Sequence, residues 1–184
     1  MKRTLFALAL MAALPLSAQA SELKYNYIEG GYARTTVAGF DFNGYDLKGS
    51  AAFGDDFFGT ASYTHGSKNG ADINEGTVGL GYRIPVSDKA NFDVGVSYVH
   101  DSVPGLSDNG YKVSAGFRGL MSDVVEGNIN VNYADVGDFG NGIGAGAGLV
   151  FHVNDTWGIT TGYDYAKRDS LHFNTWNLGA RASF

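Results

Sequence analysis

The chain has 184 residues, a net charge of −6 and no cysteine. The acidic balance excludes the basic footprint of a nucleic-acid-binding protein, and the lack of cysteine excludes a disulfide framework. With 27 glycines, 11 tyrosines, 12 phenylalanines and only 3 prolines, the composition favours β structure in one domain.

The first twenty residues have the three parts of a secretory signal peptide. Lys2 and Arg3 give a positive start, residues 4–16 are almost wholly apolar, and residues 17–20 end in an Ala-x-Ala pattern. The apolar run is shorter than the roughly 20 residues that a membrane-spanning helix needs, so a transmembrane anchor is the weaker alternative. We expect cleavage after Ala20 and a mature domain of residues 21–184, in which 11 basic and 19 acidic side chains give a net charge of −8.

Ten segments in which apolar and polar residues alternate follow along the mature chain, and each predicts a strand. Taken from the first to the last apolar-face residue, they cover 28–32, 45–53, 57–65, 78–84, 92–98, 111–117, 125–133, 143–153, 157–165 and 176–184. Short turns at 54–56, 85–89, 121–123 and 154–155 alternate with longer connections at 37–42, 66–74, 101–109, 135–141 and 168–173. This order predicts five hairpins.

An even number of strands, with short turns on one side and longer loops on the other, is typical of an outer-membrane barrel. We therefore predict an all-β fold, a membrane-spanning up-and-down antiparallel β-barrel of ten strands preceded by the signal peptide. A soluble sandwich or lipocalin-like barrel is the alternative. It would need the apolar face of every strand inside.

The second face of the segments carries the charges that the apolar face lacks. Six acids and six bases lie on it: Glu29, Asp46, Lys48, Glu75, Arg83, Asp93, Lys112, Arg118, Glu126, Asp164, Arg168 and Arg181. A soluble barrel would expose these charges to water with no need for balance. A narrow membrane barrel would enclose them, and an unpaired charge there would cost several kcal/mol. The balance therefore predicts a network of ion pairs in the lumen, with the alternating glycines of 142–148 leaving room for long side chains.

Aromatic residues of the apolar face separate by type between the two ends of the segments. Near the short turns lie Phe53, Phe57, Phe92, Phe117, Phe151, Trp157 and Phe184, and toward the longer connections lie Tyr32, Tyr45, Tyr63, Tyr98, Tyr111, Tyr133, Tyr163 and Trp176. Because amphipathic rings collect at the headgroup level of a membrane, we predict two aromatic belts. The alternative is that aromatic residues simply favour strands.

The first and last segments carry a family resemblance. The run YIEGGYA at 27–33 resembles the first strand of small OmpA/OmpX-type barrels, and NTWNLG at 174–179 with the terminal Phe184 resembles their last strand. In such families an alternating apolar strand that ends in phenylalanine is the signal read by the outer-membrane assembly machinery. The resemblance assigns that role to Trp176, Leu178, Ala180, Ala182 and Phe184. The count of ten strands departs from the eight of OmpX-type barrels.

The sequence YNYIEGGY, together with the leader, is similar to a family of small xanthomonad outer-membrane proteins. Members of that family were once described as secreted quorum factors or elicitors of plant immunity. The similarity extends over the whole chain and rests on few distinctive sequence motifs.

Three functions are compatible with such a barrel. The first is a non-enzymatic envelope protein with a charge-balanced, largely filled lumen and short surface loops, since a lumen near the ~8-strand size can be filled by side chains. The second is a narrow, low-conductance channel. The third and most remote is an outer-leaflet lipid A deacylase, in which His65 with Ser67 or His100 with Ser102 would act with an acid such as Asp72 or Asp108. A histidine at a strand end is more often a rim residue, so we predict no catalytic residue.

We predict no cofactor and no metal site, because turn chemistry explains the Asp, Asn and Gly of the connections and EF-hand ligand spacing is absent. The expected partners are outer-membrane lipid and lipopolysaccharide on the exterior, and the barrel-assembly machinery with periplasmic chaperones during biogenesis. We expect a monomer in the outer membrane of a Gram-negative bacterium, with both mature termini in the periplasm.

Overall fold

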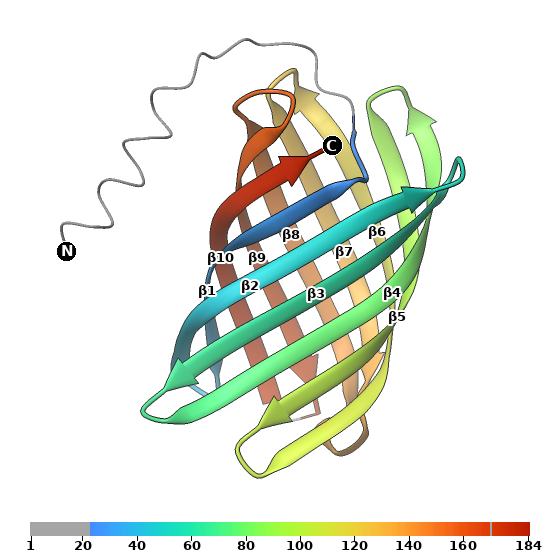
Figure 1. Ribbon diagram of the computed structural model, residues 1–184. Coiled ribbons are helices and arrows are strands. Elements are labelled where there is room, and N and C mark those ends of the chain that lie inside the picture. The colour runs from blue at the N-terminus through green and yellow to red at the C-terminus, as the bar shows by residue number, and fades with distance from the viewer. Residues whose placement is uncertain (1–22, 170) are drawn as a thin grey trace, which may run out of the picture.

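The computed structural model describes residues 23–169 and 171–184, which form one closed antiparallel barrel (Figure 1). Its ten strands are β1 (Tyr27–Val37), β2 (Phe40–Phe53), β3 (Phe57–Lys68), β4 (Ala71–Ser87), β5 (Ala90–Val103), β6 (Leu106–Ser122), β7 (Val125–Asp135), β8 (Asn141–His152), β9 (Trp157–Arg168) and β10 (Leu171–Ser183). A single turn of 3-10 helix, η1 (Gly137–Phe139), lies between β7 and β8. The predicted fold class is confirmed, with ten strands and not eight. The predicted signal peptide lies outside the described residues.

Each strand pairs with its neighbours in sequence, and the barrel closes where β1 meets β10. The closing pair runs in unbroken register from Tyr27 opposite Ser183 to Val37 opposite Phe173. The last amide of the chain, that of Phe184, donates to the carbonyl of Asn26 at 3.0 Å. Closure leaves no sheet edge with unpaired backbone groups, which is the condition for a sheet to cross a bilayer.

The two ends of the barrel are named here by the chain termini. The end that holds Tyr27 and Phe184 is called proximal, and the opposite end, which holds the β1–β2 and β3–β4 turns, is called distal (Figure 1). No helix in the described part of the chain is long and apolar enough to cross a membrane.

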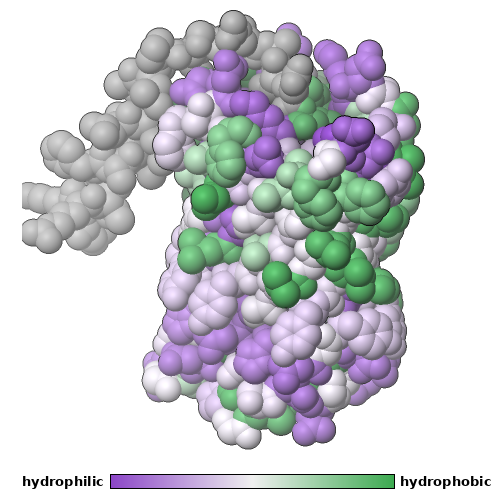
Figure 2. Space-filling view, turned by 45° about the vertical axis from the view of Figure 1, so that its right-hand side comes forward, coloured by the Kyte–Doolittle hydropathy of each residue, from purple (hydrophilic) through white to green (hydrophobic). Residues whose placement is uncertain are grey.

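The sides of the strands are arranged as the alternation predicts, with apolar side chains outward. Ile28 and Ile129 on the outer face are both 61% exposed, whereas Glu126 on the inner face is 0% exposed. Hydrophobic residues gather on the upper and middle part of the face seen in Figure 2, between hydrophilic residues at the two ends. An apolar surface of this extent is far larger than a soluble monomer exposes, and it suits contact with lipid. The soluble alternative is therefore wrong.

The distal connections differ from the prediction, because most of the residues expected in loops belong to strands. The predicted loop 66–74 is instead a continuation of β3 and β4 around the tight turn Asn69–Gly70, whose φ angles are 50° and 82°. Positive φ at both central residues is the geometry of an Asn-Gly hairpin turn. Polar residues beyond the apolar band keep the ladder of backbone hydrogen bonds, so the change in polarity marks the edge of the membrane zone and not the end of the strand. One five-residue connection, 136–140, remains and contains η1.

Candidate functional site

A buried ion cluster centred on Glu126 lies in the lumen near the proximal end. Arg118 donates to both carboxylate oxygens of Glu126, from Nε at 2.6 Å and from Nη2 at 3.0 Å. Arg181 donates Nη1 to Glu126 at 3.0 Å and Nη2 to Glu29 at 2.9 Å. Lys48 extends the chain of charges, with Nζ 3.7 Å from Glu29 and 3.2 Å from Asp46. Six of the twelve predicted lumen charges are thus brought into one network.

Tyr25, which precedes β1, packs against this cluster from inside the barrel. Its ring is 4% exposed, and its hydroxyl donates to Asp93 at 2.7 Å and accepts from Asn91 at 3.1 Å. The guanidinium of Arg118 lies 4.7 Å above the ring, and Arg83 lies 5.1 Å from it on another side. The segment before the first strand therefore places a side chain inside the proximal end of the lumen. Sequence reasoning missed Tyr25 because the residue lies outside every alternating segment.

A second ion cluster lies toward the distal end. Arg168 pairs with Asp101 and, through Nη2 at 3.3 Å, with Glu75. Lys112 approaches the other oxygen of Glu75 at 3.8 Å. Asp101 is 6% exposed, although its position suggested a surface loop. The sequence does contain a signal for this position. Tyr98 faces outward, so Asp101, three residues later on the same strand, faces the lumen.

An apolar cap covers this cluster at the distal mouth. The connection 136–140, here called the distal cap, folds inward so that Val136 and Phe139 are buried against Val99 and Ala134. Asp108 fastens the cap by accepting the backbone N–H of Asp138 at 2.8 Å. At the same point Gly137, with φ of 43°, passes so close to Asp108 that an added Cβ would lie 1.9 Å from its carboxylate. Only glycine fits there.

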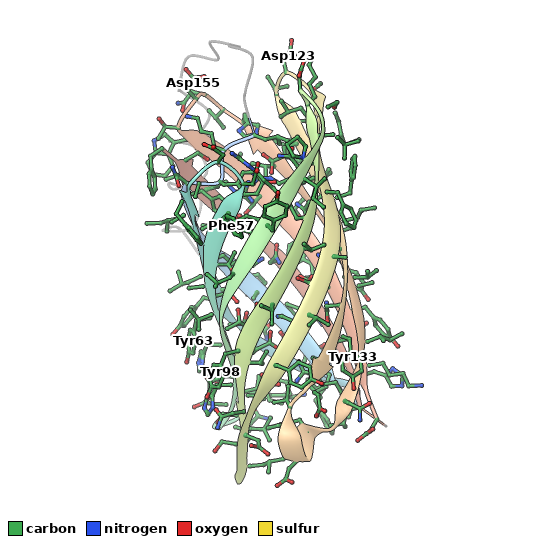
Figure 3. The ribbon with its side chains drawn as sticks, turned by 90° about the vertical axis from the view of Figure 1, so that its right-hand side faces the viewer. Phe57, Tyr63, Tyr98, Asp123, Tyr133 and Asp155 are labelled. Carbon is green, nitrogen blue, oxygen red and sulfur yellow. The ribbon has the colours of Figure 1, made fainter. Side chains whose placement is uncertain are left out.

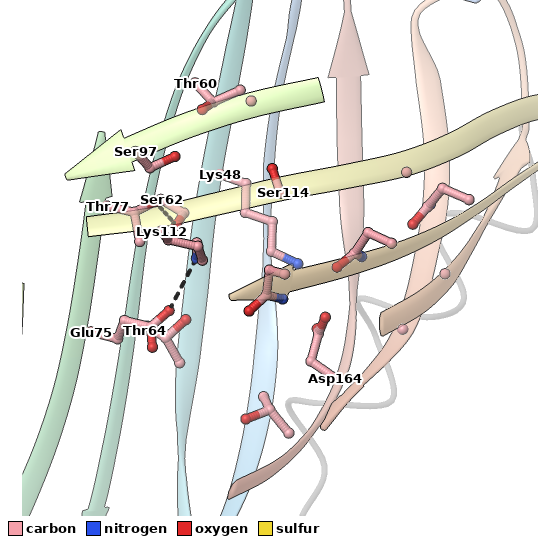
Figure 4. A pocket seen from close by; sticks show the side chains of 18 of the residues that line it. Lys48, Thr60, Ser62, Thr64, Glu75, Thr77, Ser97, Lys112, Ser114 and Asp164 are labelled. Carbon is pink, nitrogen blue, oxygen red and sulfur yellow. Dashed lines mark hydrogen bonds and ion pairs between the residues drawn. The ribbon is translucent and has the colours of Figure 1, made fainter. Parts of the chain in front are cut away.

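Between the two clusters the lumen is hollow. A cavity of about 500 Å³ is lined by apolar groups together with hydroxyls and amides, and Lys48, Lys112 and Asp164 project into it (Figure 4). Ser62 and Thr77 share a hydrogen bond of 2.7 Å, whereas Asp164 has no ion pair within 4.0 Å among the described residues. At about 30 Å³ per molecule the space suits on the order of ten or more waters. The cavity occupies the middle of the lumen, and the expected filling is not confirmed.

The predicted belt residues all lie on the outer face and are exposed. At the proximal end these are Phe53, Phe57, Phe92, Phe151 and Trp157, and toward the distal end Tyr63, Tyr98, Tyr133 and Tyr163. Figure 3 shows Phe57 on the half of the barrel that carries Asp123 and Asp155, and the three labelled tyrosines on the other half. The residues proposed as the assembly signal, Trp176, Leu178, Ala180, Ala182 and Phe184, follow one another along the outer face of β10.

The histidines considered for catalysis also lie on the outer face, near the distal end. His65 Nδ1 lies 2.8 Å from the side-chain oxygen of Asn74, and His100 Nδ1 lies 2.7 Å from that of Asn109. Asp108 accepts hydrogen bonds from two backbone amides instead. In the described residues, therefore, the side-chain amides of asparagines orient the two imidazoles. A lipid A deacylase would need a carboxylate in that position.

A closed barrel with an apolar exterior and an enclosed, charged lumen defines a membrane-spanning β-barrel protein. The model of the outer membrane protein beta-barrel domain family matches residues 6–184. The chain belongs to this family and is an outer-membrane protein of the Gram-negative type.

Solved structures with a similar fold include several outer-membrane proteins. Ail, the attachment invasion locus protein of Yersinia pestis, is 20% identical, with 86% of this chain and 97% of Ail covered and a TM-score of 0.45. The NanC porin is 14% identical, with 86% and 99% covered and a TM-score of 0.50. Neisserial surface protein A is 14% identical, with 86% and 95% covered and a TM-score of 0.40. At these identities the likeness concerns the fold alone. No curated protein sequence matches the chain.

Proposed function

We propose that this protein is a non-enzymatic outer-membrane barrel whose lumen is closed to the flow of solutes and whose role is in envelope structure or surface contact. The observation that carries the proposal is a cluster of buried side chains toward each end of the lumen. Arg118 and Glu126 seal one end with Tyr25, and Arg168 and Phe139 seal the other. Leaving a buried charge without its partner costs about 3–5 kcal/mol, so neither cluster parts readily.

The proposal includes an orientation in the membrane. The proximal end would face the periplasm, with residues 1–20 removed as a signal peptide and 21–184 forming the barrel. The distal turns would face outward, and lipopolysaccharide would surround the tyrosine-rich half. The barrel-assembly machinery would read the outer face of β10 after delivery by periplasmic chaperones, and the product would be a monomer.

Conductance in planar bilayers tests the closure directly. Refolded protein with heat-modifiable gel migration, which reports a folded barrel, should give no steady current. Steady stepwise currents from the unmodified protein would overturn the proposal.

The hollow middle of the lumen favours a narrow channel as the second candidate. The cavity of about 500 Å³ contains Asp164, which forms no ion pair within the described part of the chain, and a charged group of this kind suits a solute path. Only the distal cap and the pairs of Arg168 separate it from the distal mouth. The same bilayer recording decides between the two, because a channel of this kind must conduct without any substitution.

A further inference from the structure

A hydrogen bond between a tyrosine and an asparagine recurs around the distal half of the outer face. In four hairpins a tyrosine hydroxyl donates to the side-chain oxygen of the asparagine eleven residues later: Tyr32 to Asn43, Tyr63 to Asn74, Tyr98 to Asn109 and Tyr163 to Asn174. The β7–β8 hairpin departs from the pattern, since Gly144 follows Tyr133 at this spacing. The spacing places the two residues of each pair on adjacent strands as diagonal neighbours, since Asn74 lies opposite His65 and not opposite Tyr63.

Two neighbouring hairpins add a histidine to this pair. His65 and His100 each stand two residues after the tyrosine, and each ring bonds the same asparagine oxygen as the tyrosine does, at 2.8 and 2.7 Å. We call these two groups, Tyr63 with His65 and Asn74 and Tyr98 with His100 and Asn109, the twin clusters. They lie side by side, because β4 pairs with β5 and sets Asn74 opposite Ser102.

Each cluster has hydrogen-bond donors and acceptors left over after its internal hydrogen bonds are formed. The asparagine oxygen has two lone pairs, and the tyrosine O–H and the histidine Nδ1–H occupy both. The remaining ring nitrogen, Nε2, is then an acceptor, and the asparagine NH₂ offers two donors for which the described residues supply no partner. With neutral imidazoles each cluster therefore both donates and accepts hydrogen bonds.

At Gly76 the outer face carries no side chain between the two clusters, and this gap is here called the hollow. Gly76 of β4 lies opposite His100, and a Cβ added to Gly76 would meet its nearest atoms, the His100 carbonyl and a ring carbon of Tyr63, at 3.9 Å. The rings of Tyr63 and Tyr98 are 40% and 52% exposed on either side and project outward from the distal half (Figure 3). Such rings stand at the headgroup level of a bilayer.

The ligand that fits is a sugar and not a phosphate. Hydroxyl and amide groups of a sugar each donate and accept, as the clusters do, and aromatic rings suit the C–H faces of a pyranose. A phosphate only accepts and is bound best by lysine or arginine, but the charged residues next to the clusters in sequence are the acids Glu75, Asp101 and Asp108. We propose that the twin clusters bind the sugar headgroup of a glycolipid in the outer leaflet, an inference that rests on the outward orientation in the proposed function.

Lipid retention measures this binding. The refolded barrel is incubated in detergent with rough lipopolysaccharide, and the number of bound molecules per barrel is counted by native mass spectrometry. Two variants remove the site: His65→Phe with His100→Phe, which leaves each asparagine oxygen with one donor, and Gly76→Leu, which fills the hollow. Gly59→Leu is the matched control, because Gly59 also lies on the outer face with its nearest atoms at 3.9 Å but in the proximal half.

The expected result is a loss of about tenfold in lipopolysaccharide affinity for both site variants, as for one or two lost hydrogen bonds, with Gly59→Leu unchanged. Binding should survive when the phosphates of the lipopolysaccharide are removed chemically. Equal retention of lipopolysaccharide by the unmodified protein and the three variants overturns the proposal. Loss of binding when the lipopolysaccharide is dephosphorylated also overturns it. So does an equal loss of binding, in the site variants, of phosphatidylglycerol, a lipid without a sugar headgroup that is tested in the same way. Heat-modifiable migration confirms that each variant folds. Conductance of the same samples tests the closed lumen separately, so a conducting barrel that retains glycolipid contradicts only the proposed function.

Discussion

Arg118 holds Glu126 with two hydrogen bonds, from Nε at 2.6 Å and from Nη2 at 3.0 Å, inside a barrel whose outer surface is apolar. The pair bridges β6 and β7, and Arg181 joins it from β10 at 3.0 Å. Two neighbouring strands and a third from elsewhere in the barrel therefore meet at one carboxylate. A planar guanidinium suits this arrangement because its fixed fork matches the two oxygens of the carboxylate.

Replacing the central acid should be the most damaging single change in the lumen. Glu126→Gln leaves Arg118 and Arg181 without their shared partner at a site that is 0% exposed, so the free energy of unfolding should fall by about 3–5 kcal/mol. Urea unfolding in phospholipid vesicles measures it. Asp41→Asn is the control, because the Arg34–Asp41 pair is exposed at the distal rim, where solvent screens the charges and little change is expected. Equal effects of the two substitutions would contradict the central role of Glu126.

The distal cap should limit the entry of reagents into the cavity. The chain has no cysteine, so Ser97→Cys, whose side chain lines the cavity, places a unique thiol inside. A bulky, membrane-impermeant maleimide should label it slowly. Adding Phe139→Ala should raise the labelling rate about tenfold or more. If the substitution removes about 1.4 kcal/mol from the free energy that keeps the distal cap closed, the fraction of molecules with an open cap rises tenfold. Asp72→Cys, on the exposed distal surface, should react rapidly in both backgrounds. If Ser97→Cys alone reacts as fast as Asp72→Cys, the lumen is open.

Much of the fold follows from the sequence because a barrel strand has one strict requirement, an apolar outer face at a period of two. That requirement placed ten strands, and it set Leu178 outward and Arg181 inward. The ends of the strands do not follow, since outside the lipid zone polar residues satisfy the same ladder. For this reason Asp101 was assigned to a loop when it belongs to the distal ion cluster.

The parts of the site that the sequence did not reveal are those made by segments without alternation. Tyr25 enters the lumen from a stretch before β1, and Phe139 enters it from a turn of 3-10 helix. Nothing in the local pattern distinguishes either one from a surface residue. The Tyr–Asn spacing of eleven is different, because it is visible in the sequence as a fourfold repeat and depends only on hairpin register.

The terminal phenylalanine should be needed for insertion and not for the strength of the barrel. Phe184 is 68% exposed and contributes only its backbone N–H to the closing seam. Phe184→Ala should leave the protein in the periplasm of expressing cells, as cell fractionation would show, because its side chain ends the series proposed as the assembly signal. Phe151→Ala, which removes another exposed phenylalanine of the proximal end, should insert normally. Normal insertion of Phe184→Ala would remove the assembly role.

Which face of the strands meets the lipid can be tested by placing a lysine at either of two consecutive positions of β7. Ile129 on β7 points to lipid and Asn130 points into the lumen, where its amide lies beside the carboxylate of Asp164 across Gly146. Ile129→Lys should destabilise the barrel by about 2–4 kcal/mol, the cost of a cation near the middle of a bilayer. Asn130→Lys should cost much less, because the cavity has room for the side chain and Asp164 offers a partner. The reverse order of the two unfolding free energies, measured with urea in the same vesicles, would mean that the apolar face is not the one that meets the lipid.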